Sequence, residues 1–260
     1  MIFLAMLALG FLIGLVGAGG AGITITMLTV GFGVPIHTAL GVSLASMSFT
    51  MLSGTISHFL SGDVIVKIGL VTGVFGMIGS MTGTYFSTYI PEKLLSSATG
   101  IMLLLSTVLL YFQLFKPEKL FGIVKVNVSE GEVSKFRFFL GAAGVGLFNG
   151  FLSGAFGIGA AAFIQISLML LFRISLYHAI GTTMMIILPI SIAGGIGHLI
   201  SGHLDLQIFI QTLAGLVIGA FIGAKFTRLI PKNILKYIIV SIPSLGGLLL
   251  LVNLKNLIKL

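Results

Sequence analysis

The sequence predicts an all-α polytopic membrane protein that consists of two homologous halves. Hydrophobic residues make up 57% of the 260 residues and charged residues only 8%, whereas soluble domains carry roughly 25% charged residues. Apolar runs of about 20 residues, long enough to cross a bilayer, follow one another along the chain. The chain also repeats itself at a fixed offset, since His198 in the second half matches His58 in the first (198 − 58 = 140).

The repeat extends over most of both halves without a gap. The pattern Gly10-x-x-x-Gly14-x-x-Gly17-x-Gly19 returns as Gly150-x-x-x-Gly154-x-x-Gly157-x-Gly159. The same offset pairs Gly41 with Gly181, Gly79 and Gly83 with Gly219 and Gly223, and Ile90-Pro91 with Ile230-Pro231. Duplication in such an apolar chain is typical of membrane transporters, whose substrate sites lie between the two halves.

Each half contains about four helical elements. The first elements are residues 2–33 and 137–172, the second are 38–61 and 178–201, the third are 65–89 and 205–229, and the fourth are 93–114 and 233–254. Pro91 and Pro231 precede the fourth elements, where proline is tolerated in a first helical turn. We therefore expect a first transmembrane repeat over 1–115, a polar linker over 116–136 and a second transmembrane repeat over 137–260. The alternating segment 124–133 of the linker is consistent with a small hairpin.

The first element of each half is too long and too rich in glycine for one straight helix. A single helix over residues 2–33 would be about 48 Å long, against a hydrocarbon core of about 30 Å. Glycine costs about 1 kcal/mol relative to alanine inside a helix, so the clusters at 17–22 and 157–159 predict an interruption. A kinked, tilted helix and a re-entrant hairpin of two half-helices both fit this pattern.

The distribution of basic residues favours the re-entrant hairpin. If all the elements cross, the Lys and Arg residues divide 8 to 6 between the two sides. If the first elements re-enter, Lys93, Lys255 and Lys259 lie on one side and the other 11 (14 − 3) on the opposite side. Because membrane proteins concentrate basic residues on the cytoplasmic side, we predict three crossings per half, an inverted repeat and termini outside the cell. The same rule assigns the net charge of +8 to orientation in the membrane and not to nucleic-acid binding.

Several classes of function are excluded by what the sequence lacks. It has no cysteine, which excludes disulfides and thiolate metal sites. No metal-ligand spacing, catalytic triad or phosphate loop is present, so we expect no cofactor, no metal and no enzymatic activity. The first basic residue is Lys67, so residues 1–16 are expected to belong to the fold and not to a signal peptide. The expected partners are the lipid bilayer and a small anionic substrate, with a homodimer left open.

The glycine clusters are the first candidates for a substrate site. A broken helix presents backbone N–H groups and the positive end of a helix dipole, which suit an anion. We therefore expect substrate contacts at Gly17, Gly19, Gly20, Gly157 and Gly159. Close helix packing is the alternative, and it is the better interpretation for Gly10, Gly14, Gly79 and Gly83.

Polar side chains near the second elements are the next candidates. Ser43, Ser46, Thr182 and Thr183 offer neutral donors to an anion, although capping or bonding back to the helix is equally consistent. Gln165 either lines the site or makes a packing hydrogen bond.

Few ionisable side chains are expected inside the membrane spans, and the two matched histidines are the main candidates. His58 and His198 are either protonatable partners of an anion or interfacial residues that cap a helix end. His37 and His203 are expected in loops. Asp63, Asp205 and Glu92 lie at turns, so no span is expected to bury a carboxylate.

These motifs together resemble the TauE/SafE family of sulfite and organosulfonate exporters, also called the toluene-sulfonate uptake permease family. The resemblance covers nearly the whole chain and includes the glycine clusters, the Ile-Pro pairs, Ala39-Leu40-Gly41-Val42-Ser43 and Ala179-Ile180-Gly181-Thr182-Thr183. The two copies differ at Val42 against Thr182 and at Gly20 against Ala160. The resemblance implies transport of small sulfur- or carbon-containing anions and leaves substrate and direction open.

We therefore predict a multi-pass secondary transporter of the cell membrane. It would carry small sulfur-containing or organic anions, such as sulfite, sulfonates or sulfoacetate, by alternating access between the halves. Two alternatives remain open: an anion channel of the same architecture and a non-transporting membrane scaffold.

Overall fold

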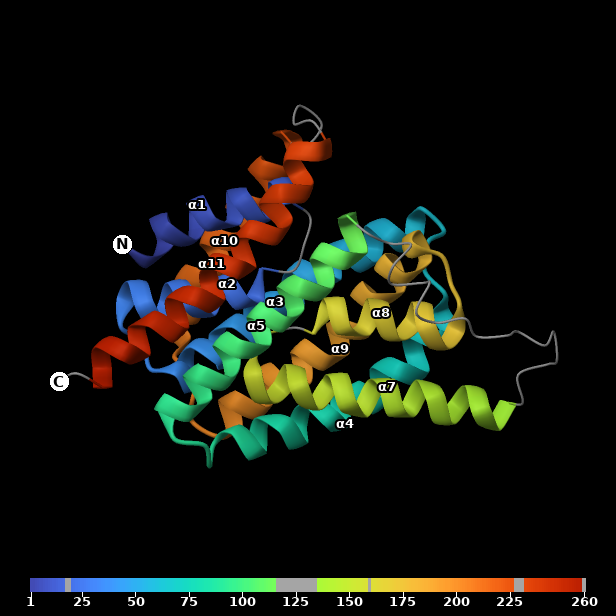
Figure 1. Ribbon diagram of the computed structural model, residues 1–260, viewed down its shortest axis with the longest axis horizontal. Helices are drawn as coiled ribbons and strands as arrows, with labels where there is room; N and C mark the ends of the chain where they lie inside the picture. Colours follow the sequence, from blue (N-terminus) through green and yellow to red (C-terminus); the bar gives the residue numbers. More distant parts are fainter. Residues whose placement is uncertain (17–19, 116–134, 159, 227–231, 259–260) are drawn as a thin grey trace.

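In the computed structural model the chain folds into helices that follow the repeat (Figure 1). The structure describes residues 1–16, 20–115, 135–158, 160–226 and 232–258. Its elements are α1 (Ile2–Val16), α2 (Ala21–Thr26), the π-helix η1 (Met27–Gly31), α3 (Ile36–Leu60), α4 (Val66–Ser87), α5 (Glu92–Phe115), α7 (Lys135–Phe156), α8 (Ala161–Phe172), α9 (Leu176–Ile200), α10 (Leu206–Phe226) and α11 (Lys232–Ile258). The described part contains no strand, which confirms the all-α prediction, and the hairpin predicted at 124–133 lies outside it.

Six helices of the described residues are long and apolar enough to cross a membrane by length and composition. They belong to α3, α4, α5, α7, α9 and α10. Large apolar side chains project from their outer faces: Phe59 is 57% exposed, Phe148 is 62% exposed and Phe221 is 66% exposed. Such continuous apolar exposure suits contact with lipid chains.

Both predicted breaks occur, and the chain turns back on itself at each of them (Figure 1). At the second break Gly157 (φ 64°) and Ala160 (φ 46°) adopt left-handed backbone conformations, which end α7 and start α8 in a new direction. The reversal favours a hairpin over a kinked helix. However, the 22 residues of α7 extend about 33 Å, so α7 is not the half-helix that the sequence predicted.

Each half contributes its first helix to the other half. The helix α7 packs on α4 and α1 packs on α10 along seams of small residues. A Cβ at Gly150 would overlap the carbonyl of Gly76, and a Cβ at Gly219 would overlap the carbonyl of Leu7. The exchange interlocks the two halves.

The same seams settle the role of three other glycines. A Cβ at Gly10 would lie 2.6 Å from the Leu216 carbonyl oxygen, and one at Gly79 or Gly83 would overlap a carbonyl of α7. The packing interpretation of these three residues is confirmed. The surroundings of Gly14 lie outside the part of the structure that is described.

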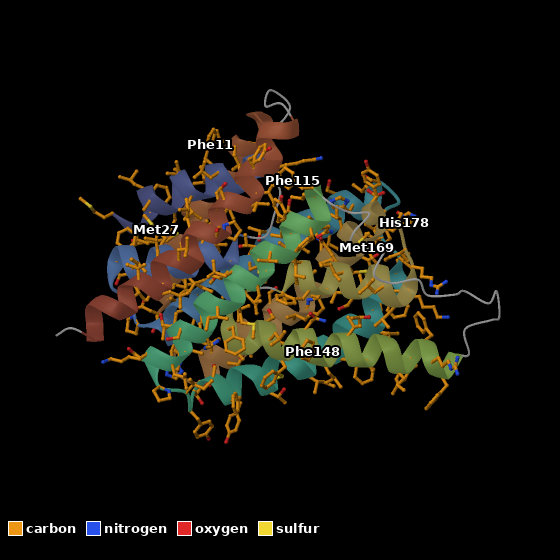
Figure 2. The ribbon with its side chains drawn as sticks, viewed as in Figure 1. Phe11, Met27, Phe115, Phe148, Met169 and His178 are labelled. Atoms are coloured by element: carbon orange, nitrogen blue, oxygen red, sulfur yellow. The ribbon has the colours of Figure 1, made fainter. Side chains whose placement is uncertain are left out.

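The equivalent helices α3 and α9 cross the centre of the molecule antiparallel to one another. Gly41 near the start of α3 contacts His198 near the end of α9, while Gly54 near the end of α3 contacts Met184 near the start of α9. The fourth helices α5 and α11 also pack together. Phe115, labelled in Figure 2, lies at the end of α5. Its ring centroid is 5.0 Å from that of Tyr237 on α11. A space between these two helix pairs is therefore shared by both halves.

Candidate functional site

A pocket of about 190 Å³ occupies this shared space. Its walls come from α2, α3 and α5 of the first half and from α8, α9 and α11 of the second. Its polar side chains are Ser106, Gln113, Gln165 and Thr183. The other described lining residues are apolar side chains and glycine, and none of the described residues that line it is charged.

Two amides connect the halves at the wall of this pocket. Gln113 on α5 is buried, and its Nε2 donates a hydrogen bond of 2.8 Å to Oε1 of Gln165 on α8. The Nε2 group of Gln165 and the Oε1 atom of Gln113 therefore stay available to a bound molecule. Gln165 combines the two roles that the sequence left open, because it lines the pocket and makes a packing hydrogen bond.

The adjacent residues Thr182 and Thr183 at the start of α9 make different contacts. Thr183 is only 1% exposed and lines the pocket, and its Oγ1 has no hydrogen-bond partner among the described residues. Thr182 accepts a hydrogen bond of 3.0 Å from the backbone N–H of Ile65. It therefore anchors the start of α4, whereas Thr183 offers its hydroxyl to the pocket.

Two helix N-termini, one from each half, reach the same pocket. The helix α2 begins after Gly20 and α8 begins after Ala160, and in the described structure neither N-cap residue forms a side-chain hydrogen bond to its helix. The first N–H groups of a helix have no partner within it. Gly22 of α2 and Ala161 and Ala162 of α8 line the pocket, so the positive ends of both helices border it.

The remaining candidates of the first half lie beside the pocket. Ser43 Oγ donates a hydrogen bond of 2.9 Å to the Ala21 carbonyl and so ties α3 to the start of α2. Gly20 and Ser43 line a second cavity of about 20 Å³ that is bounded by α10. Ser46 is fully buried, its Oγ has no partner within the described ranges, and it lines neither cavity.

Gly157 at the second break packs next to the residues that line the pocket. A Cβ at Gly157 would lie 2.5 Å from Leu40 Cδ2 and 2.9 Å from Ile25 Cδ1, so the chain passes close to α2 and α3. The next residue, Ile158, lines the pocket. Gly17, Gly19 and Gly159 lie outside the described residues.

The matched histidines do not line the main pocket. The Nδ1 atom of His58 lies 3.2 Å from Oδ2 of Asp63, and both side chains are about 30% exposed (30% and 28%). This position fits the interfacial interpretation of His58. His198, in contrast, is 0% exposed.

Three histidines that lie far apart in the sequence come together around His198. The His203 ring centroid lies 6.5 Å from that of His198 and 4.9 Å from that of His37, on which it stacks. His37 was expected in a loop but lies in the first turn of α3 and is buried, because α3 begins at Ile36, directly after Pro35. Helical periodicity in the sequence does not reveal such a contact between distant turns.

Comparison with known proteins agrees with this architecture. Residues 2–250 match the family described as "Sulfite exporter TauE/SafE". The chain is 44% identical over 251 residues to "Probable membrane transporter protein YdhB" of Bacillus subtilis, covering 96% of this chain and 99% of that relative. It is 31% identical over 247 residues to "Probable membrane transporter protein YunE" of the same organism, covering 88% and 89%.

A more distant relative is similar over the same length. "Probable membrane transporter protein YjnA" of Bacillus subtilis is 26% identical over 256 residues, with 96% of this chain and 98% of that relative covered. No solved structure matches the chain. The family match over nearly the whole chain and the membrane-length helices lead to one conclusion: the chain belongs to the sulfite exporter TauE/SafE family and is a multi-pass membrane transporter.

Proposed function

We propose that the protein is a secondary transporter that binds a small sulfur-containing or organic anion in the shared pocket. The observation that carries the proposal is the convergence of two uncapped helix N-termini, one from each half, on a single cavity. Helix N-termini attract anions through their free N–H groups and their partial positive charge. Two such ends replace the lysine or arginine that a soluble anion site would use.

The side chains of the pocket suit the oxygen atoms of an anion. Thr183 offers a hydroxyl donor and Gln165 offers its Nε2 group. No acidic side chain is among the described lining residues, so nothing there repels a negative charge. Neutral donors bind an anion reversibly, as a carrier requires, because the bound ion must also leave.

The size of the pocket favours a compact substrate. Its volume is about 190 Å³. Pockets for drug-sized ligands start at roughly 300 Å³. Sulfite and sulfoacetate are smaller than drug-sized ligands and therefore suit a pocket of this volume. The description of the family makes sulfite the first anion to test.

Alternating access is supported by the position of the pocket and by the direction of the helices. The pocket lies between the halves, as in carriers that rock one repeat against the other. Equivalent helices α3 and α9 run antiparallel, which is the arrangement expected if the two repeats have opposite orientations in the membrane.

Counterflow in proteoliposomes tests the proposal. Vesicles loaded with unlabelled sulfite or sulfoacetate should take up the labelled anion faster than empty vesicles, because a carrier returns loaded faster than it returns empty. Equal uptake with and without internal anion would indicate a channel. Absence of uptake for sulfite, sulfoacetate, taurine and simple carboxylates would leave the scaffold interpretation.

A further inference from the structure

We propose that His37, His198 and His203 form a proton-binding site that couples movement of the anion to movement of a proton. This inference rests on the proposed transport function and adds the ion that drives it. The site is separate from the anion pocket, since none of the three histidines lines that pocket. The sequence offers no carboxylate inside a span for this purpose, because Asp63, Asp205 and Glu92 lie at or beside turns.

The three rings lie in a row, with the half-buried ring of His203 between the buried rings of His37 and His198. His203 lies in the turn between α9 and α10, His37 opens α3, and His198 lies in the last turn of α9. The centroid distances of 4.9 Å (His37 to His203) and 6.5 Å (His203 to His198) make His203 the middle ring. A neutral imidazole can accept a proton on one nitrogen and release one from the other, so adjacent rings can pass a proton along.

Most of the ring nitrogens of the three histidines form no hydrogen bond to another described residue. Both nitrogens of His198, Nδ1 of His37 and Nδ1 of His203 are buried and have no hydrogen-bond partner in the described part of the chain. Buried polar atoms are normally paired. Four nitrogens in one cluster are therefore free to accept or donate a proton.

A proton on His198 would meet a suitable partner at the end of α7. The backbone carbonyl of Gly154 lies near the His198 ring and also accepts a hydrogen bond of 3.5 Å from Thr84 Oγ1. Gly154 lies in the last turn of α7, which ends at Phe156. The C-terminal end of a helix carries partial negative charge and stabilises a cation. This partner offsets part of the cost of burying a charge at His198.

The same segment connects the proton site to the anion pocket. Gly154 faces His198, and Ile158, about one helical turn further along the break, lines the pocket. Ala161 then opens α8 at the pocket wall. A proton that draws the Gly154 carbonyl toward His198 therefore pulls on the segment that presents the N-terminus of α8 to the anion.

The ionisable groups around the cluster are few. Within the described residues, His37 is acted on by His203 and by Glu92 of α5, and His198 is acted on by His37 and His203. Glu92 is exposed in the first turn of α5. Its negative charge can therefore attract protons to the His37 side of the cluster.

The repeat supplies an internal control for this assignment. The offset that pairs His58 with His198 also pairs Asp63 with His203 and places Tyr177 at the position equivalent to His37. His58 already has the Asp63 carboxylate at 3.2 Å. The histidine chain thus exists at one end of the α3–α9 pair, and a paired His–Asp contact exists at the other.

Sulfoacetate uptake into proteoliposomes tests the assignment with wild type, His198→Gln, His203→Gln and the matched control His58→Gln. Sulfoacetate stays fully ionised near neutral pH because carboxyl groups titrate near about pH 4. Each protein is measured for exchange at equal pH on both sides and for uptake driven by a pH gradient. Thermal unfolding and size-exclusion chromatography check that each variant is folded.

We expect wild type and His58→Gln to accumulate sulfoacetate several-fold more with the gradient than without it. His198→Gln and His203→Gln should lose this stimulation and keep exchange within about twofold of wild type. Gradient-driven accumulation by folded His198→Gln would overturn the inference, as would exchange by wild type that ignores the gradient. Loss of exchange in both folded variants would also overturn it, because the rings would then serve the anion path. Absence of all exchange in wild type would overturn the proposed function and the coupling role together.

Discussion

Gln113 of α5 and Gln165 of α8 share a hydrogen bond of 2.8 Å across the boundary between the two halves. The bond orients both amides, because the donor of one is fixed on the acceptor of the other. The Nε2 group of Gln165 is therefore directed by the first half while it belongs to the second. This pair joins the two halves at the pocket wall, and it leads to the first prediction.

Substitution Gln165→Glu should lower anion flux at least about tenfold. A carboxylate at this position would repel the substrate, and two unit charges about 4 Å apart interact by roughly 4 kcal/mol at the effective dielectric constant near a protein surface. The control is Gln207→Glu, which places the same charge on the exposed start of α10. Initial uptake rates in proteoliposomes measure the effect, and unchanged flux in folded Gln165→Glu would argue against an anion at this wall.

Substitution Thr183→Val should weaken anion binding at least about tenfold, because a hydrogen bond to a bound charge contributes about 1.5–3 kcal/mol. Its effect on thermal unfolding should be small, since Thr183 Oγ1 has no protein partner among the described residues. Thr182→Val should show the reverse, because it leaves the Ile65 N–H without its acceptor. The concentration dependence of uptake measures anion binding, and melting curves measure stability. If both variants change binding and stability equally, the two threonines do not have the separate roles described above.

Substitution Gly157→Ala should reduce both stability and transport. Gly157 has φ 64°, and an added Cβ would lie 2.5 Å from Leu40 Cδ2, so steric overlap adds to a left-handed backbone penalty of about 1–2 kcal/mol. Gly202→Ala is the matched control, because Gly202 has φ 73° with no atom within 4 Å of the added Cβ. If both variants lose the same thermal stability, the contact with Leu40 has no role in holding the break.

Substitution Gly150→Ala should lower the melting temperature by about 5–10 °C. Overpacking costs up to about 3 kcal/mol, and each kcal/mol lowers the melting temperature of a chain of this size by about 2–4 °C. The new methyl group would overlap the Gly76 carbonyl and push α7 away from α4. Gly144→Ala lies on the same helix with no atom within 4 Å of its Cβ, so it should leave the melting temperature unchanged or slightly higher. Detergent-solubilised protein suffices for this measurement.

The repeat made most of the fold predictable, and the long-range contacts account for what was missed. The helices α3 (Ile36–Leu60) and α9 (Leu176–Ile200) differ by the 140-residue offset at both ends, and the glycine clusters identified both breaks. Gln113 was not recognised because it lies near the end of an otherwise ordinary apolar helix, and its role depends on where α8 packs. The proximity of His37 to His203 likewise depends on tertiary structure, since 166 residues (203 − 37) separate them in the chain.

The predicted inverted repeat and re-entrant first elements stay predictions about the membrane. The structure has the chain reversal at both breaks (Figure 1). It also has an α7 of 22 residues, which begins at Lys135, before the start predicted at residue 137. Hydropathy did not reveal this extension because the first turn of α7 contains basic residues.

The glycines of α4 let helices pack more closely in the first half than at the equivalent position in the second half. Gly69, Gly73 and Gly76 let α9 approach until an added Cβ would lie 2.6–3.0 Å from Met185, Pro189 and Ile190. At the equivalent positions α10 has Phe209, Leu213 and Leu216, and α10 packs much less extensively on α3 than α4 does on α9. The helices α4, α7 and α9 thus form one closely packed group, and α1 and α10 form another. We therefore expect motion between these two groups during transport to occur at the loosely packed boundary between α3 and α10.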